Sequence, residues 1–292
     1  MNATIPTSDA RNTEPTSAGG NGAPQVLLLH GFTGSSQSWS AVAQQLQKHV
    51  PHPIELFAPS LLGHAPSDLP ALSNARTFSG AAAVPCAPTA FVQHADAVLD
   101  WAIAKGFRAG VVCGYSLGGR IAIDLLTRHT VRATAAVVIS STAGVQDPAT
   151  RRERARADAK QAEMLRRQGL AAFIEYWNQL PLFSSQRRLP RAVRDTQQRL
   201  RATHHADGLA TSLEQLGLAQ MPNCWPLLSK VRCPVRVVTG ELDAKFTQIG
   251  KRLVQSLPNA EHRRLRGVGH NPLLETPETV ASEIATSLCC GD

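Results

Sequence analysis

The chain has 292 residues, of which 43% are hydrophobic and 18% are charged, and this composition excludes a chain that is disordered throughout. No apolar run approaches the roughly 18 residues that a membrane-spanning helix needs, so we expect no membrane partner. Lys and Arg number 30 against 22 Asp and Glu, but aromatic residues make up only 5% and no nucleic-acid-binding motif is present. An anionic small-molecule substrate explains this positive charge equally well, and we expect no nucleic-acid partner.

The N-terminus and the cysteines bear on where the protein works. Residues 1–23 are rich in Ser, Thr, Asn and Gly and lack the apolar segment of a secretory signal, so they predict a disordered tail. The six cysteines form no C-x-x-C pair and show no metal-ligand spacing. These features predict a cytoplasmic protein with reduced thiols, no metal and no cofactor, which is a monomer or a small homo-oligomer.

Apolar runs alternate with amphipathic stretches along most of the chain. A continuous apolar run at 24–30 is typical of a strand buried on both faces, and a second short apolar run occurs at 53–58. Further strand-like segments occur at 109–114, 133–140, 233–240 and 262–265. Helical spacing occurs at 37–49, 91–105, 117–129, 246–256 and 277–288. This alternation predicts a parallel sheet with helices on both faces.

Residues 144–226, here called the cap segment, have a different texture. They are dense in arginine and show helical stretches near 150–168, 170–178, 191–203 and 208–218. We therefore expect a helical cap inserted into a core made of residues 24–143 and 227–288. Residues 69–89, rich in Ala, Pro and Ser, predict a surface loop.

A G-x-S-x-G pattern is formed by Gly114, Ser116 and Gly118 between the predicted strand 109–114 and the predicted helix 117–129. A sharp strand-to-helix turn strains the serine and projects its hydroxyl from the sheet, and the two glycines avoid a clash. The amides at the start of the helix favour negative charge at the same point. The pattern predicts a catalytic serine.

An acid and a histidine follow the next two predicted strands. Asp243 comes after 233–240, and His270 comes after the strand that follows. The chain order Ser116, Asp243, His270 is the order of a catalytic triad on this kind of sheet. His270 would move the proton, and Asp243 would hold its tautomer. Glu241 is a rival for the acid.

The turn after the first strand contains His30-Gly31-Phe32. We expect the Phe32 and Leu117 amides to converge on one oxygen and to stabilise negative charge that appears only in the transition state. His64, in the loop after the second strand, is expected to order that loop.

From about residue 24 to 288 the chain resembles the α/β-hydrolase superfamily, whose fold is a mostly parallel sheet flanked by helices with an inserted helical cap. It is similar, more narrowly, to the 2-succinyl-6-hydroxy-2,4-cyclohexadiene-1-carboxylate synthases of menaquinone biosynthesis. The segments that carry this resemblance are LHGFTGSSQSW (29–39), GYSLGGR (114–120), TRRERARAD (150–158), FIEYWNQLPLF (173–183), GLATSLEQLG (208–217), GELDAKF (240–246) and GHNPLLETPE (269–278). A generic esterase need match none of the cap segments.

The resemblance implies a lyase that eliminates pyruvate from a succinyl-enolpyruvyl-hydroxycyclohexene carboxylate. Ser116, activated by His270, would remove a ring proton without forming an acyl-enzyme. The Phe32 and Leu117 amides would receive the oxyanion that forms on the succinyl carbonyl.

The resemblance also implies that the substrate is bound by Arg120, Arg154, Arg201, Tyr115 and Trp177. Guanidinium groups suit carboxylates because two parallel N–H groups meet two oxygens. Alternatives remain for several of these residues. Arg154 lies in a charge run that also suits a solvated helix face, Arg199 competes with Arg201, and Tyr115 and Trp177 also suit plain core packing.

The chain departs from the family pattern in two places. The loop at 58–67 has no Asp where the family has D-x-P-G-H-G, and the loop at 69–89 is longer than expected. Other functions therefore remain in competition. A carboxylesterase or a carbon–carbon bond hydrolase would use the same triad, although an esterase favours an apolar cap over arginines facing Ser116. A non-catalytic binding protein of this fold would not need an intact triad.

Overall fold

Six parallel strands form one sheet in the computed structural model, which describes residues 22–66, 69 and 89–289. The order across the sheet is β2-β1-β3-β4-β5-β6, and all neighbouring strands are parallel. The strands are β1 (Gln25–Leu29), β2 (Glu55–Phe57), β3 (Gly110–Tyr115), β4 (Ala133–Ile139), β5 (Val235–Gly240) and β6 (Ala260–Leu265). This sheet confirms the predicted α/β fold.

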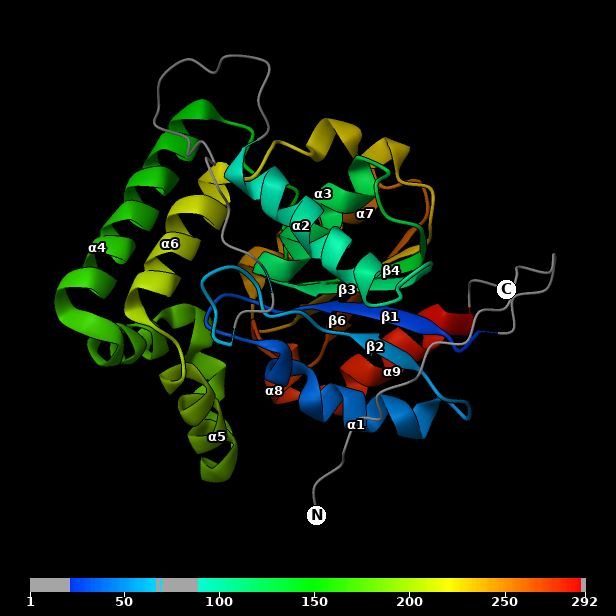
Figure 1. Cartoon of the computed structure of the whole chain (residues 1–292), viewed down its shortest axis with the longest axis horizontal. Helices are drawn as coiled ribbons and strands as arrows, with labels where there is room; N and C mark the ends of the chain where they lie inside the picture. Colours follow the sequence, from blue (N-terminus) through cyan, green and yellow to red (C-terminus); the bar gives the residue numbers. More distant parts are fainter. Residues whose placement is uncertain (1–21, 67–68, 70–88, 290–292) are drawn as a thin grey trace.

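Helices cover both faces of the sheet (Figure 1). On one face lie α1 (Ser40–His49), α8 (Pro272–Glu275) and α9 (Pro277–Leu288). On the other lie α2 (Ala90–Ala104), α3 (Leu117–Thr127) and α7 (Ala244–Ser256). The inner strands β1 and β3 are almost entirely buried because helices exclude water from both faces of the sheet, whereas the edge strand β6 (AEHRRL) is partly exposed. The short α8 was not predicted, because four residues are too few to show a helical period.

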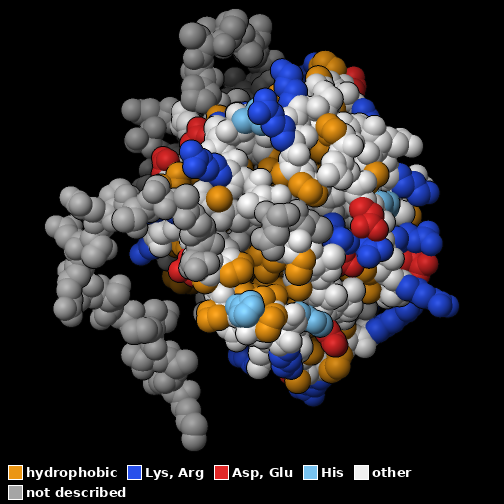
Figure 2. Space-filling model, turned by 90° about the vertical axis from the view of Figure 1, so that its right-hand side faces the viewer, with side chains coloured by type: hydrophobic (Ala, Val, Ile, Leu, Met, Phe, Trp, Pro, Cys, Tyr) orange, Lys and Arg blue, Asp and Glu red, His pale blue; other side chains and the backbone are white. Residues whose placement is uncertain are grey.

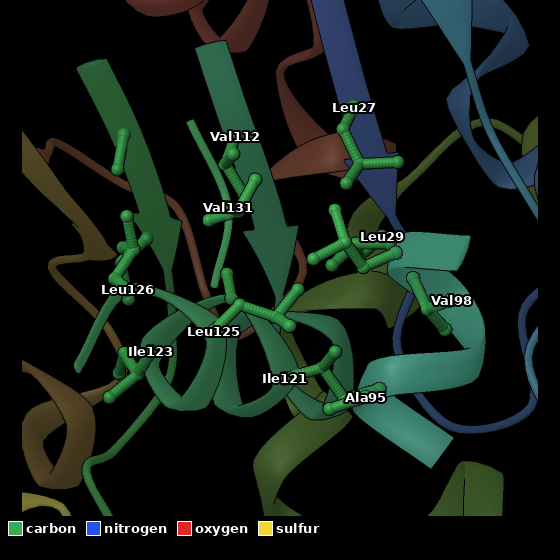
Figure 3. Close-up of a cluster of buried hydrophobic side chains, with 14 of the residues drawn as sticks. Leu27, Leu29, Ala95, Val98, Val112, Ile121, Ile123, Leu125, Leu126 and Val131 are labelled. Carbon is green, nitrogen blue, oxygen red and sulfur yellow. The ribbon is translucent and has the colours of Figure 1, made fainter. Parts of the chain in front are cut away.

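The core between the sheet and α2–α3 supports the edge where β1 and β3 end. Figure 3 shows Leu27 and Leu29 of β1 and Val112 of β3 above side chains of these two helices. Ile121 of α3 and Val98 of α2 are among the fully buried side chains in this cluster. Each such side chain contributes about 1.5–3 kcal/mol by leaving water. The ends of β1 and β3 are therefore held on a closely packed base.

The cap segment is helical and lies between β4 and β5 in the sequence. In space it lies apart from the helices that flank the sheet (Figure 1). Its elements are α4 (Pro148–Gln179), the 3-10 helix η2 (Pro181–Arg188), α5 (Arg191–Ala202) and α6 (Ala206–Leu216). Helix α4 is bent at Gly169, where φ is 82° and ψ is 173°. This bend separates the two helical stretches that the sequence predicts on either side of it. An apolar cluster joins α4 to α6 through Ala162, Leu165, Phe173, Leu209, Ala210 and Leu213.

Three further 3-10 helices complete the described elements: η1 (Ser36–Trp39), η3 (Leu218–Gln220) and η4 (Trp225–Lys230). In the part of the chain that the structure describes, no helix is long and apolar enough to cross a membrane. On the face shown in Figure 2, basic side chains lie in several separate groups with acidic side chains among them. Two predictions, the tail at 1–23 and the loop at 69–89, fall almost entirely outside the described residues.

Candidate active site

Ser116 stands at the turn between β3 and α3 in a conformation that few residues adopt. Its φ is 50° and its ψ is −105°, a strain that persists only where the surroundings enforce it. A Cβ at Gly114 would lie 2.4 Å from the Gly118 carbonyl oxygen, and one at Gly118 would lie 2.1 Å from that of Leu29. Neither position accepts a side chain, because rigid backbone occupies the space. The turn thus holds the Ser116 hydroxyl at the carboxyl edge of the sheet.

Three side chains from distant parts of the chain meet beyond this edge. His270 Nε2 lies 3.3 Å from Ser116 Oγ, and His270 Nδ1 lies 2.6 Å from Asp243 Oδ2. Asp243 also caps α7, since its Oδ1 accepts a hydrogen bond from the Phe246 N–H at 3.2 Å. Asp243 and His270 are buried. This arrangement allows Asp243 to hold a proton on Nδ1, which leaves Nε2 to accept the serine proton.

The rival acid Glu241 lies elsewhere. Its Oε2 accepts a hydrogen bond from the Gly267 N–H at 3.0 Å, so it supports the turn that leads to His270. The structure therefore brings Asp243, and not Glu241, to the imidazole.

The two segments that carry the Phe32 and Leu117 amides are joined directly. The Gly118 N–H donates to the His30 carbonyl oxygen at 3.0 Å, which ties the start of α3 to the end of β1. Within the described residues, neither the Phe32 N–H nor the Leu117 N–H donates to a protein acceptor. Two such amides next to an activated hydroxyl are suited to bind an oxyanion.

A cavity of about 700 Å³ lies between Ser116 and the cap segment. Gln161, Trp177 and Ser212 line it from the cap side. Each has a buried polar atom without a hydrogen-bond partner: Gln161 Oε1, Trp177 Nε1 and Ser212 Oγ. Such unpaired atoms cost stability unless a ligand or water satisfies them. The cavity is therefore built for a polar occupant.

Two of the three predicted arginines line this cavity, Arg120 from the core and Arg154 from α4. Arg120 donates to the Leu216 carbonyl oxygen at 2.9 Å and lies over the Phe91 ring. Burial, assisted by the nearby charge of Arg154, lowers the pKa of Arg120 to about 9. Arginine remains charged at neutral pH even so, and an anionic ligand would offset the cost of keeping two guanidinium groups together.

Arg201 is placed differently. It lines a neighbouring cavity of about 460 Å³ instead of the Ser116 cavity. It is only 4% exposed, donates to Asn178 Oδ1 and lies over the Phe183 ring. Burial lowers the pKa of Arg201 to about 10. Its rival Arg199 is exposed and donates to Thr196 Oγ1.

The two predicted aromatic residues also line the Ser116 cavity. Trp177 stacks on Phe173 at 5.5 Å between ring centroids and meets the Phe32 ring edge-on at 5.1 Å. Tyr115 lines both cavities, and burial raises the pKa of its hydroxyl. Each side chain is thus packed against neighbours and also forms part of a wall.

Several residues in or next to the cavity wall were not predicted from the sequence. Phe246 packs against His270 with ring centroids 4.6 Å apart, and Lys245 lies beside it. Asp158 is buried and forms an ion pair with Arg154 at 2.8 Å. The spacing of Arg154 and Asp158, one helical turn apart, is the signal that could have shown this pair. Among the described residues, no three His, Cys, Asp or Glu side chains are placed to share a metal ion.

Comparisons with known proteins find a matching family model and relatives that cover most of the chain. The family model described as "Alpha/beta hydrolase family" matches residues 26–283. A protein of Bacillus subtilis (strain 168), "Putative 2-succinyl-6-hydroxy-2,4-cyclohexadiene-1-carboxylate synthase", is 33% identical over 273 residues, covering 92% of this chain and 93% of its own. A 2-succinyl-6-hydroxy-2,4-cyclohexadiene-1-carboxylate synthase of Enterobacter sp. (strain 638) is 31% identical over 273 residues, covering 94% and 95%.

Solved structures show the same fold. MenH from S. aureus superposes with a TM-score of 0.78 at 24% identity, covering 92% of this chain and 94% of its own. A thermophilic esterase from Thermogutta terrifontis superposes with a TM-score of 0.74 at 23% identity, covering 92% and 90%. The fold alone therefore does not separate the candidate activities.

Proposed function

This chain belongs to the alpha/beta hydrolase family, and we propose that it is a lyase that eliminates pyruvate from a succinyl-enolpyruvyl-hydroxycyclohexene carboxylate. The product would be 2-succinyl-6-hydroxy-2,4-cyclohexadiene-1-carboxylate, an intermediate of menaquinone biosynthesis. The full-length similarity to relatives that bear this enzyme's name supports the proposal.

The observation that carries the proposal is the pair of guanidinium groups in the Ser116 cavity. Arg154 is partly neutralised by Asp158, whereas the hydrogen bond of Arg120 goes to a neutral carbonyl. Placing two cations together at a partly buried site is costly unless the occupant is anionic. A substrate with three carboxylates meets this requirement, and a small neutral ester does not.

In the proposed reaction Ser116 is a base. His270 Nε2 accepts the Ser116 hydroxyl proton while Oγ takes the ring proton beside the succinyl carbonyl. The electron pair of that C–H bond moves onto the carbonyl oxygen and forms an oxyanion. Asp243 stabilises the imidazolium that results.

The oxyanion then collapses and drives out the leaving group. The Phe32 and Leu117 amides stabilise this oxyanion by hydrogen bonds. Its collapse forms the ring diene and breaks the bond between the ring carbon and the enolpyruvyl oxygen. The departing enolate takes a proton from His270 and leaves as pyruvate, which restores the triad. No acyl-enzyme forms.

The test measures pyruvate release from the proposed substrate in an assay coupled to lactate dehydrogenase. Wild-type protein should release one pyruvate per cyclohexadiene formed, and Ser116→Ala should release almost none. Wild-type protein that leaves this substrate unchanged but hydrolyses small esters would refute the lyase and support the serine hydrolase instead.

A further inference from the structure

The turn that carries the Phe32 amide contains a strained residue that is held from two sides. Thr33 is buried and has a φ of 63°, in the left-handed region that a β-branched residue avoids. The turn closes on itself, since the Gly34 N–H donates to the Gly31 carbonyl oxygen at 3.0 Å. Such a conformation persists only where its surroundings hold it.

Two histidines form hydrogen bonds with the backbone of Thr33. The Thr33 N–H donates to His64 Nε2 at 3.2 Å, and the Thr33 carbonyl oxygen accepts from His204 Nε2 at 3.1 Å. The imidazoles of His64 and His204 meet edge-on at 5.4 Å between centroids, and both residues are buried. The residue next to Phe32 is therefore held through both its backbone N–H and its backbone carbonyl oxygen.

The partners of each ring determine its tautomer. His204 Nδ1 accepts from the Ala65 N–H at 3.0 Å, so its proton must lie on Nε2, which donates to Thr33. His64 Nε2 accepts from Thr33, so its proton must lie on Nδ1, which faces the Leu62 carbonyl oxygen at 3.0 Å. All four ring nitrogens are used in hydrogen bonds, which leaves none of them to bind a ligand.

His204 belongs to the cap segment, between α5 and α6, whereas Thr33 and Ala65 belong to the core. A second contact fixes the same junction. A Cβ at Gly63 would lie 2.0 Å from the Gly208 carbonyl oxygen, so the start of α6 and the loop at 61–65 touch backbone to backbone. A displacement of the cap segment would therefore be transmitted through His204 to the turn at Thr33.

We propose that His204 is a positioning residue that couples the seating of the cap segment to the position of the Phe32 amide. The inference rests on the proposed role of that amide in binding the oxyanion. Loss of the contact between His204 and Thr33 should lower kcat and leave KM nearly unchanged, because the oxyanion exists only in the transition state.

Two substitutions separate the two hydrogen bonds of His204. In His204→Gln the side-chain Nε2 can keep the donation to Thr33, whereas in His204→Asn the Oδ1 can keep only the bond from Ala65. His205→Gln changes the exposed neighbour and serves as the matched control. Melting temperatures of all variants would show how much each change affects folding alone.

The readout is labelling of Ser116 by diisopropyl fluorophosphate, followed by mass spectrometry. The Ser116 oxygen attacks phosphorus, fluoride leaves, the serine proton passes to His270, and the phosphoryl oxygen occupies the position of the oxyanion. We expect His204→Asn to slow labelling by about 10- to 100-fold. His204→Gln and His205→Gln should label at close to the wild-type rate.

Equal labelling rates in the Gln and Asn variants, whether both fast or both slow, would overturn the inference. If the protein releases no pyruvate but His204→Gln and His204→Asn still differ in labelling rate, the lyase would be refuted and this inference would stand.

Wild-type protein provides a second measurement if a variant does not fold. NMR of the ring nitrogens should show the Nε2–H tautomer for His204, and this signal should shift when Ser116 is labelled. An Nδ1–H tautomer, or a signal that labelling leaves in place, would contradict the proposal.

Discussion

In the core, Ser116 and Asp243 follow the ends of β3 and β5, whereas in the cap segment Arg154 and Trp177 project from α4. The core residues are fixed by short backbone connections and by glycines that cannot accept a side chain. The cap residues are fixed by an ion pair and by aromatic packing, and their polar atoms are only partly satisfied. Under the proposed function, the core would supply proton transfer, which many reactions share, and the cap, together with Arg120 of the core, would select the substrate.

Substitution of the core serine should have the largest effect on activity. Ser116→Ala removes the base, so turnover of the proposed substrate should fall by about 1,000-fold or more. The hydroxyl adds little to packing, and the melting temperature should change by no more than a few degrees. Calorimetry and pyruvate release would check both values. Near-wild-type turnover in this variant would show that the core does not supply the reacting group.

Loss of a cavity arginine should have the next largest effect. Arg120→Ala and Arg154→Ala should each lower kcat/KM for the polycarboxylate substrate by about 10- to 100-fold, since each removes a charged hydrogen bond. Lys at either position should restore only part of the loss, because an ammonium cannot make the paired contact.

The matched control for Arg154 is Arg167→Ala, which changes an exposed arginine elsewhere on α4. It should leave kcat/KM unchanged. Turnover of a small neutral ester, where detectable, should be the same in all these variants. A loss of ester turnover equal to the loss on the anionic substrate would show that the arginines support the core and do not select the substrate.

A backbone change in the cap should have a smaller effect, on stability. At Gly169 the φ of 82° and ψ of 173° suit glycine almost alone, although no atom would lie within 4 Å of an added Cβ. Gly169→Ala should therefore lower the free energy of unfolding by about 1–3 kcal/mol through strain alone. Urea denaturation would measure it. An unchanged or increased stability would mean that α4 straightens without cost.

Acid pH should affect the core through its buried histidines. Burial lowers the pKa of His30 to about 4 and that of His94 to about 3, from an ordinary value of 6.5. Below pH 6.5 the unfolded chain binds protons that the folded chain does not, so stability is lost as the pH falls. Each such histidine should contribute about 1.4 kcal/mol per pH unit between pH 6 and 4.

The variant His94→Gln tests this expectation, because its amide can still accept the bond that His94 receives from the Leu62 N–H. Between pH 6 and 4, unfolding of this variant should take up one proton fewer than unfolding of wild type, so its unfolding free energy should change less steeply with pH. His129→Gln replaces an exposed histidine just beyond the C-terminal end of α3 and serves as a control for histidine loss in general. Equal slopes in His94→Gln and wild type would mean that His94 takes up its proton in the folded state.

The sequence by itself determined the α/β fold and the serine turn. The spacing of hydrophobic residues and the local composition decide which segments form strands and helices. The glycines around Ser116 prevent steric clashes at this sharp turn. The order of Ser116, Asp243 and His270 along the chain also predicted the residues that the structure brings together, although it left Glu241 as a rival for the acid.

Only the tertiary structure decided which polar side chains meet across the junction of core and cap. It placed Asp243 and not Glu241 at His270, buried Arg201 beside a second cavity, and joined His204 to a turn 171 residues away in sequence. No local pattern encodes such pairs. They depend on how the surfaces of the cap and the core pack together, and an arginine on a helix has the same periodicity whether it faces water or a cavity.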